Sequence, residues 1–162
     1  MNKTGLGLIG GLMISAMAVL GGCEGMTTGT EIAVVALQPA ADGVRAAYAP
    51  VKFTLSPGMN PIAFNFRADI ALDASEYGKW NGYRATLMRD GAPVAVKNFS
   101  AHSPSDGEGN SPPPTTLTRT LFYVDVSVAG EYELVIVPDR PPQITLKDAR
   151  VDARRNVQRP PQ

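Results

Sequence analysis

The residues best suited to catalysis lie together between positions 100 and 116. His102 is the only histidine in the chain, and it is followed by Ser103, Ser105, Asp106 and Glu108. Serine, histidine and a carboxylate can act as nucleophile, general base and orienting group when the fold holds them within hydrogen-bonding distance. Here they lie among glycines, serines and the run Pro112-Pro113-Pro114, which is typical of a solvated loop. We therefore expect a loop that can contact a partner, and we do not expect an enzyme.

Metal chemistry has equally few candidates. A zinc site needs several His, Cys or carboxylate ligands of fixed geometry, and the chain has one histidine and one cysteine. Asp69, Asp73 and Glu76 could bind calcium, but their spacing matches no standard calcium loop. Asp73 followed three positions later by Glu76 is instead the pattern that caps a short helical turn. We expect a cap, no metal and no cofactor.

Three glycines near the start raise the question of a nucleotide site. Gly5, Gly7 and Gly10 form G-x-G-x-x-G, which marks a dinucleotide-binding turn only between a strand and a helix. Four residues precede Gly5, too few for a buried strand, and the segment from Leu12 to Leu20 is apolar on all sides. The glycines therefore do not predict a cofactor site.

The same segment has the features of an export signal. Lys3 precedes an uncharged run from Leu6 to Leu20, the length of a signal-peptide core and short for a membrane span. Leu20-Gly21-Gly22-Cys23 then resembles the lipobox of bacterial lipoproteins, and Cys23 is the only cysteine. The resemblance implies cleavage before Cys23 and a covalent lipid on its sulfur. The alternative is an ordinary signal peptide in which Cys23 is incidental.

The lipoprotein resemblance also implies a location and a division of the chain. In such proteins Asp after the cysteine is the usual inner-membrane retention signal, whereas Glu24 stands here, so we expect the periplasmic face of the outer membrane. We expect a signal peptide over residues 1–22, a lipidated, flexible tether over 23–30, a folded domain over 31–153 and a basic tail over 154–162. That tail could contact anionic lipid headgroups, although a frayed, solvated end is the simpler interpretation.

Tyr77, Trp80 and Tyr83 form the chain's densest aromatic group. Exposed, they could stack on sugar rings or anchor a protein partner. Buried, Trp80, the only tryptophan, would simply fill one end of the core. The sequence leaves both interpretations open.

The elements that must position these residues are strands. Ile62, Phe64, Phe66, Ala68, Ile70 and Leu72 alternate with other residues, which predicts one buried and one solvent-facing side. Asp90-Gly91 predicts a tight hairpin, and Ala129-Gly130 predicts a second one. Seven or eight strands and no helix predict an antiparallel β-sandwich. Ala129–Leu134 resembles the A-G-x-Y-x-L corner of immunoglobulin-like and related sandwiches, in which the tyrosine hydroxyl bonds back to the chain.

Charge and composition narrow the function further. The signal segment holds one of the 15 basic and none of the 15 acidic residues, so the remainder carries a net charge of about −1. This balance argues against nucleic acid as a partner. We expect a non-catalytic envelope lipoprotein that binds or supports another envelope component, most readily a protein. The alternatives are a carbohydrate- or peptidoglycan-binding module and an inhibitor or immunity protein.

Overall fold

The protein is an all-β sandwich. The computed structural model describes residues 28–41, 47–71, 73–104 and 116–161. The described part contains eight strands and two short 3-10 turns, η1 (Pro57–Met59) and η2 (Ala74–Glu76). The strands are β1 (Thr30–Ala36), β2 (Val51–Leu55), β3 (Ile62–Ile70), β4 (Trp80–Arg89), β5 (Ala92–His102), β6 (Thr116–Val124), β7 (Gly130–Pro138) and β8 (Leu146–Arg155). Among these residues, no helix has the length and apolar character needed to cross a bilayer. Cys23, the signal segment and the loop residues Ser105, Asp106 and Glu108 lie outside the described residues.

The strands form two antiparallel four-stranded sheets, in the orders β1-β8-β3-β6 and β2-β7-β4-β5. Each strand of the first half of the chain pairs with its counterpart in the second half: β1 with β8, β2 with β7, β3 with β6 and β4 with β5. This nested pairing is the arrangement of a jelly roll, a β-sandwich whose strand order differs from that of the immunoglobulin fold. The predicted antiparallel sandwich is confirmed.

One of the two predicted hairpins forms. Asp90 and Gly91 join β4 to β5 with φ angles of 49° and 78°, the left-handed backbone that such a tight turn requires. The hairpin predicted at Ala129-Gly130 is wrong, because β6 pairs with β3 in one sheet and β7 pairs with β2 and β4 in the other. The chain between Val124 and Gly130 crosses from one sheet to the other. The corner tyrosine is nevertheless present, since the buried Tyr132 donates its hydroxyl hydrogen bond to the Val128 carbonyl at 2.7 Å.

The core lies between the sheets and is rich in aromatic rings. Phe64 and Phe66 of β3 have no exposed surface. Phe64 packs edge-on against Phe53 of β2, with ring centroids 5.0 Å apart. Phe66 lies 5.1 Å from Phe99 of β5, which stacks in turn on Tyr83 at 5.2 Å. These contacts join the two sheets, as the alternation in β3 predicts.

The side of β3 that faces away from the core differs from the expectation from the sequence, which placed it in solvent. Asn65 was expected to face solvent, but it has no exposed surface. It lies on the central part of its sheet between Thr120 of β6 and Asp152 of β8, and its Oδ1 accepts a hydrogen bond from the Thr120 hydroxyl at 2.9 Å. Asp152, itself 3% exposed, pairs with Arg67 (Nη2 to Oδ2, 3.1 Å). Neighbouring polar side chains therefore cover the centre of this outer face.

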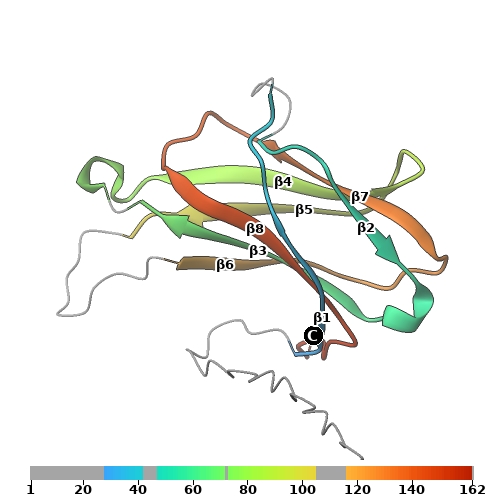
Figure 1. Cartoon of the computed structure of the whole chain (residues 1–162). Helices are drawn as coiled ribbons and strands as arrows, with labels where there is room; N and C mark the ends of the chain where they lie inside the picture. Colours follow the sequence, from blue (N-terminus) through green and yellow to red (C-terminus); the bar gives the residue numbers. More distant parts are fainter. Residues whose placement is uncertain (1–27, 42–46, 72, 105–115, 162) are drawn as a thin grey trace, which may run out of the picture.

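The two ends of the described chain meet at one end of the sandwich, called here the terminal end (Figure 1). The Gln158 amide donates a hydrogen bond to the Thr28 hydroxyl at 2.7 Å. Val157 is 4% exposed, and its amide bonds to the Pro61 carbonyl at 3.1 Å. Residues 154 and 155 therefore belong to β8, and residues 156 and 157 are bonded to the connection between β2 and β3, instead of fraying as expected.

The opposite end, called here the far end, is built from connections that are distant in sequence. Its described residues are 37–41, 47–50, 71, 73–79, 103–104 and 139–145. They belong to four connections: β1–β2, β3–β4, β5–β6 and β7–β8. Backbone hydrogen bonds hold these connections in place: Leu37 N to Ala149 O, Ala47 N to Ile136 O, Ala71 N to Thr145 O and Ser103 N to Lys79 O. The sandwich thus has two chemically different ends.

Truncation of a side chain on either face of β3 should destabilise the protein more than truncation at an exposed position. Phe66→Ala should lower the free energy of unfolding by about 3–5 kcal/mol, because it leaves a cavity in the core. Asn65→Ala should cost about 1–3 kcal/mol, because it removes a buried amide whose oxygen accepts the hydrogen bond of the partly buried Thr120 hydroxyl. Val96→Ala, at a position 57% exposed, is the control and should change it by less than about 0.5 kcal/mol. Urea unfolding measures all three, and equal values for Asn65→Ala and Val96→Ala would contradict the buried position of Asn65.

Candidate functional site

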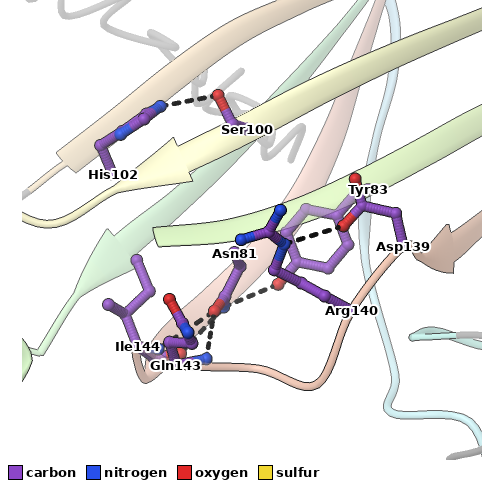
Figure 2. Close-up of polar contacts among 8 residues, drawn as sticks. All are labelled: Asn81, Tyr83, Ser100, His102, Asp139, Arg140, Gln143 and Ile144. Atoms are coloured by element: carbon purple, nitrogen blue, oxygen red, sulfur yellow. Dashed lines mark hydrogen bonds and ion pairs between the residues drawn. The ribbon is translucent and has the colours of Figure 1, made fainter. Parts of the chain in front are cut away.

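Asn81 is the polar centre of the far end. It lies on β4 at a position that faces the core and is 2% exposed. Its Oδ1 accepts hydrogen bonds from the amides of Gln143 (2.6 Å) and Ile144 (3.0 Å), and its Nδ2 donates to the Ile144 carbonyl and the Tyr83 hydroxyl, both at 2.9 Å (Figure 2). All four hydrogen-bonding positions of the amide are therefore used. One side chain fixes the connection between β7 and β8 and orients a tyrosine.

Tyr83 and Tyr48 form a pair of hydroxyls beside Asn81. Burial is the main cause that raises the pKa of both phenols. The Tyr48 hydroxyl donates a hydrogen bond to the Tyr83 oxygen, which raises the pKa of Tyr48 further. Both phenols therefore stay protonated at neutral pH; the hydrogen of Tyr48 is used within the pair, and that of Tyr83 remains.

A cavity of about 300 Å³ lies against this polar group. Its walls come from the connections before β2 and after β7, together with the start of β4. They are formed by Tyr48, Asn81 and Tyr83 and by the apolar residues Pro39, Ala40, Ala47, Pro138, Pro142, Ile144 and Leu146. None of these residues is charged. The volume is at the lower limit of ligand pockets, enough for one ring or one side chain.

Trp80 lies on the opposite side of β4 from Asn81 and Tyr83, because side chains alternate along a strand. The Arg140 guanidinium lies 3.6 Å from the centre of the indole ring, and the His102 ring stacks beside it at 5.7 Å with the planes 20° apart. Arg140 follows β7 and His102 ends β5, and these strands flank β4 on its two sides. The indole is therefore held between two side chains of its own chain.

The three aromatic residues identified from the sequence do not form one surface. Trp80 and Tyr77 are half-buried, whereas Tyr83 is 3% exposed and belongs to the core. The period of two in β4 places Trp80 and Tyr83 on opposite faces of the sheet. A shared sugar-stacking platform does not follow from this arrangement. The residues that sequence reasoning missed are Asn81, Tyr48 and Arg140.

The alternation of residues in β4 already indicates that Asn81 is buried and hydrogen-bonded. Asn81 occupies the same alternating set as Tyr83, Ala85 and Leu87, all of which are buried. Asparagine is depleted in strands and costly to bury without partners, so its presence on an apolar face indicates a hydrogen-bonded role. Which backbone it would bind depends on the β7–β8 connection, more than 60 residues away.

Gly82, next to Asn81, makes room for an acidic side chain. It faces outward, and a Cβ there would collide with the carboxylate of Asp139. The Asp139 amide donates to the Gly82 carbonyl at 3.0 Å, and the same carboxylate lies 3.6 Å from Arg140 Nε. Glycine at this position thus lets Asp139 lie where it can pair with the arginine that covers Trp80.

The serine that meets His102 is Ser100, and not one of the serines that follow it in the sequence; both residues belong to β5 and not to a loop. Ser100 Oγ and His102 Nε2 are 2.8 Å apart on β5 (Figure 2). No carboxylate among the described residues contacts His102, so a third member of a triad is missing from this part of the chain. Ser103 instead donates its hydroxyl to the Glu76 carbonyl at 2.6 Å. Both contacts stabilise the end of β5 and the residues that follow it.

The capped turn predicted from Asp73 and Glu76 is confirmed. Asp73 is the N-cap of η2, and its carboxylate accepts a hydrogen bond from the Ser75 amide at 2.8 Å. Hydrogen bonds from the Ser75 hydroxyl and, to a smaller extent, from its amide lower the pKa of the Asp73 carboxyl. Glu76 reaches the other side of the far end, where it accepts from the amide and hydroxyl of Thr145 at 2.8 and 2.7 Å. Among the described residues no group of three or more acidic, His or Cys side chains could hold a metal ion.

Comparison of the chain with protein-family models, with curated proteins and with solved structures finds no match. The functional argument therefore rests on the geometry of the far end and on the sequence.

Truncation of Asn81 should loosen the far end selectively. Asn81→Ala leaves the amides of Gln143 and Ile144 without their acceptor, so the free energy of unfolding should fall by about 2–4 kcal/mol. Amide hydrogen exchange at residues 143 and 144 should accelerate more than exchange in β3.

The matched control is Asn98→Ala. Asn98 is exposed, and within the described part of the chain its side chain accepts one hydrogen bond, from Nε of the exposed Arg84 at 3.2 Å. This variant should change stability by less than about 0.5 kcal/mol. A similar loss in both variants would show that Asn81 is not the special link described above.

Proposed function

We propose that the protein is a non-catalytic, membrane-anchored envelope lipoprotein that binds another envelope component with the far end of its sandwich. One observation carries the proposal. The first described residue, Thr28, is bound to Gln158 at the terminal end, whereas the cavity and its hydroxyl pair lie at the far end. Export and lipidation are supported by the lipobox Leu20-Gly21-Gly22-Cys23.

The position of the cavity, at the opposite end from the start of the described chain, suits a receptor held on a membrane. Five peptide steps separate Cys23 from Thr28, so a lipid on Cys23 would keep the terminal end within about 18 Å of the headgroups. β4 has ten residues and spans about 34 Å. With the strands upright, the far end would stand clear of the bilayer and open to a partner in the periplasm.

A protein partner is better supported than a glycan. Flat sugar rings are commonly bound on an exposed aromatic face, and the indole of Trp80 is flanked by Arg140 and His102. The described lining of the far-end cavity is mostly apolar and carries no charge, which favours an apolar protein surface. Glu24 in place of Asp supports the outer membrane, with the domain in the periplasm, as the location.

The anchor is tested by substitution of its attachment residue. Cys23→Ser should abolish labelling of the protein with a radioactive fatty acid, because serine has no thiol to alkylate, and unprocessed precursor should accumulate. Ser56→Ala is a control that keeps the signal segment intact and should be labelled like the wild type. On density gradients the wild-type protein should separate with the outer membrane. Fatty-acid labelling of Cys23→Ser would refute the lipoprotein assignment.

The orientation is tested by crosslinking in intact cells. A benzophenone amino acid at the exposed Gln143, at the far end, should form adducts with a partner. The same amino acid at the exposed Val128, at the terminal end, is the matched control and should form few. Adducts from position 128 with none from position 143 would place the partner at the wrong end and contradict the proposed function.

A further inference from the structure

We propose that the far-end cavity binds an uncharged side chain of a polypeptide partner and donates one hydrogen bond, from Tyr83, to a backbone carbonyl of the same segment. This inference rests on the proposed function and specifies the chemistry of its binding site.

The described residues that line the cavity carry no charge, and this decides what enters it. Its walls are three prolines, small aliphatic side chains, two tyrosines and an asparagine. An ion placed there would lose its water and find no opposite charge among the lining residues, which is costly. An apolar side chain would instead gain by leaving water. The cavity therefore selects against Asp, Glu, Lys and Arg.

The hydroxyl pair decides which polar group the ligand must carry. The Tyr83 oxygen accepts hydrogen bonds from Asn81 Nδ2, at 2.9 Å, and from the Tyr48 hydroxyl. A phenol has two acceptor positions and one hydrogen, so the acceptor positions of Tyr83 are filled and its hydrogen remains to be donated. Asn81 is fully engaged with the β7–β8 connection. The site thus presents one oriented donor, which matches one carbonyl oxygen.

A sugar ring fits this arrangement poorly. A hexose carries several hydroxyl groups, and each one buried without a partner costs free energy. The polar side chains of the cavity are already bonded to one another and offer that single donor. A peptide segment that inserts one apolar side chain presents a carbonyl and few other polar atoms, so it can be buried with its polar groups satisfied.

Small probes test the inference on the purified, full-length lipidated protein in non-ionic detergent. Ligand-detected NMR titrations would compare N-acetyl-L-leucinamide, N-acetyl-L-aspartic acid amide, which is similar in size but charged, and N-acetyl-D-glucosamine. The leucine probe should bind at least about tenfold more tightly than either of the others. Equal or tighter binding of the sugar or of the charged probe would overturn the inference.

Two variants locate the binding. Tyr83→Phe removes the donated hydrogen bond and should weaken the leucine probe about fivefold. Tyr123→Phe, on the outer face of the other sheet, is the matched control and should leave the affinity unchanged. If Tyr83→Phe does not fold, Ala40→Leu, which places a larger side chain in the cavity wall, should abolish binding. Unchanged binding in a folded Tyr83→Phe or Ala40→Leu would overturn the inference.

The inference and the proposed function fail separately. If no probe binds while position 143 still crosslinks a partner, the cavity is not the contact and this inference is wrong, but the far end remains the binding surface.

Discussion

The nested antiparallel pairing of the chain determines nearly everything else about the molecule. Each strand finds its hydrogen-bonding partner at the mirrored position in the other half of the sequence, and the two halves join at the tight turn of Asp90 and Gly91. A chain folded in this way brings Thr28 beside Gln158. It also gathers at the far end four connections that are distant in sequence. The separation of the two chain ends from the cavity lined by Tyr48, Asn81 and Tyr83, at opposite ends of the sandwich, follows directly from this pairing.

The same pairing explains which features were readable from the sequence. Alternation reveals which side chains share a face, so the buried set of β3 was predictable, as were the Asp90-Gly91 turn and the Asp73 cap, which depend on neighbours in sequence. Alternation does not reveal which strand lies alongside. The hairpin expected at Ala129-Gly130 was therefore wrong, and the burial of Asn65 was missed, because both depend on distant strands.

The candidate site illustrates this limit more sharply. Trp80 and Tyr83 are close in sequence, but the strand period separates them across a sheet, and the aromatic group divides into a surface stack and a core ring. The residues that organise the site, Asn81 and Tyr48, come from segments with no recognisable motif. Asn81 shows why such sites are difficult to predict: its chemistry is clear only once the backbone of Gln143 and Ile144 lies opposite it.

The pairing of β1 with β8 has a mechanical consequence for an anchored molecule. β1 begins at the terminal end and runs toward the far end, with β8 antiparallel beside it. A pull between a lipid at the start of the chain and a partner held at the far end would act along the axis of β1, across hydrogen bonds that lie perpendicular to it. Those bonds would share the load in shear and would not open one after another. Under the proposed lipid attachment, the domain would resist extraction by its whole first strand.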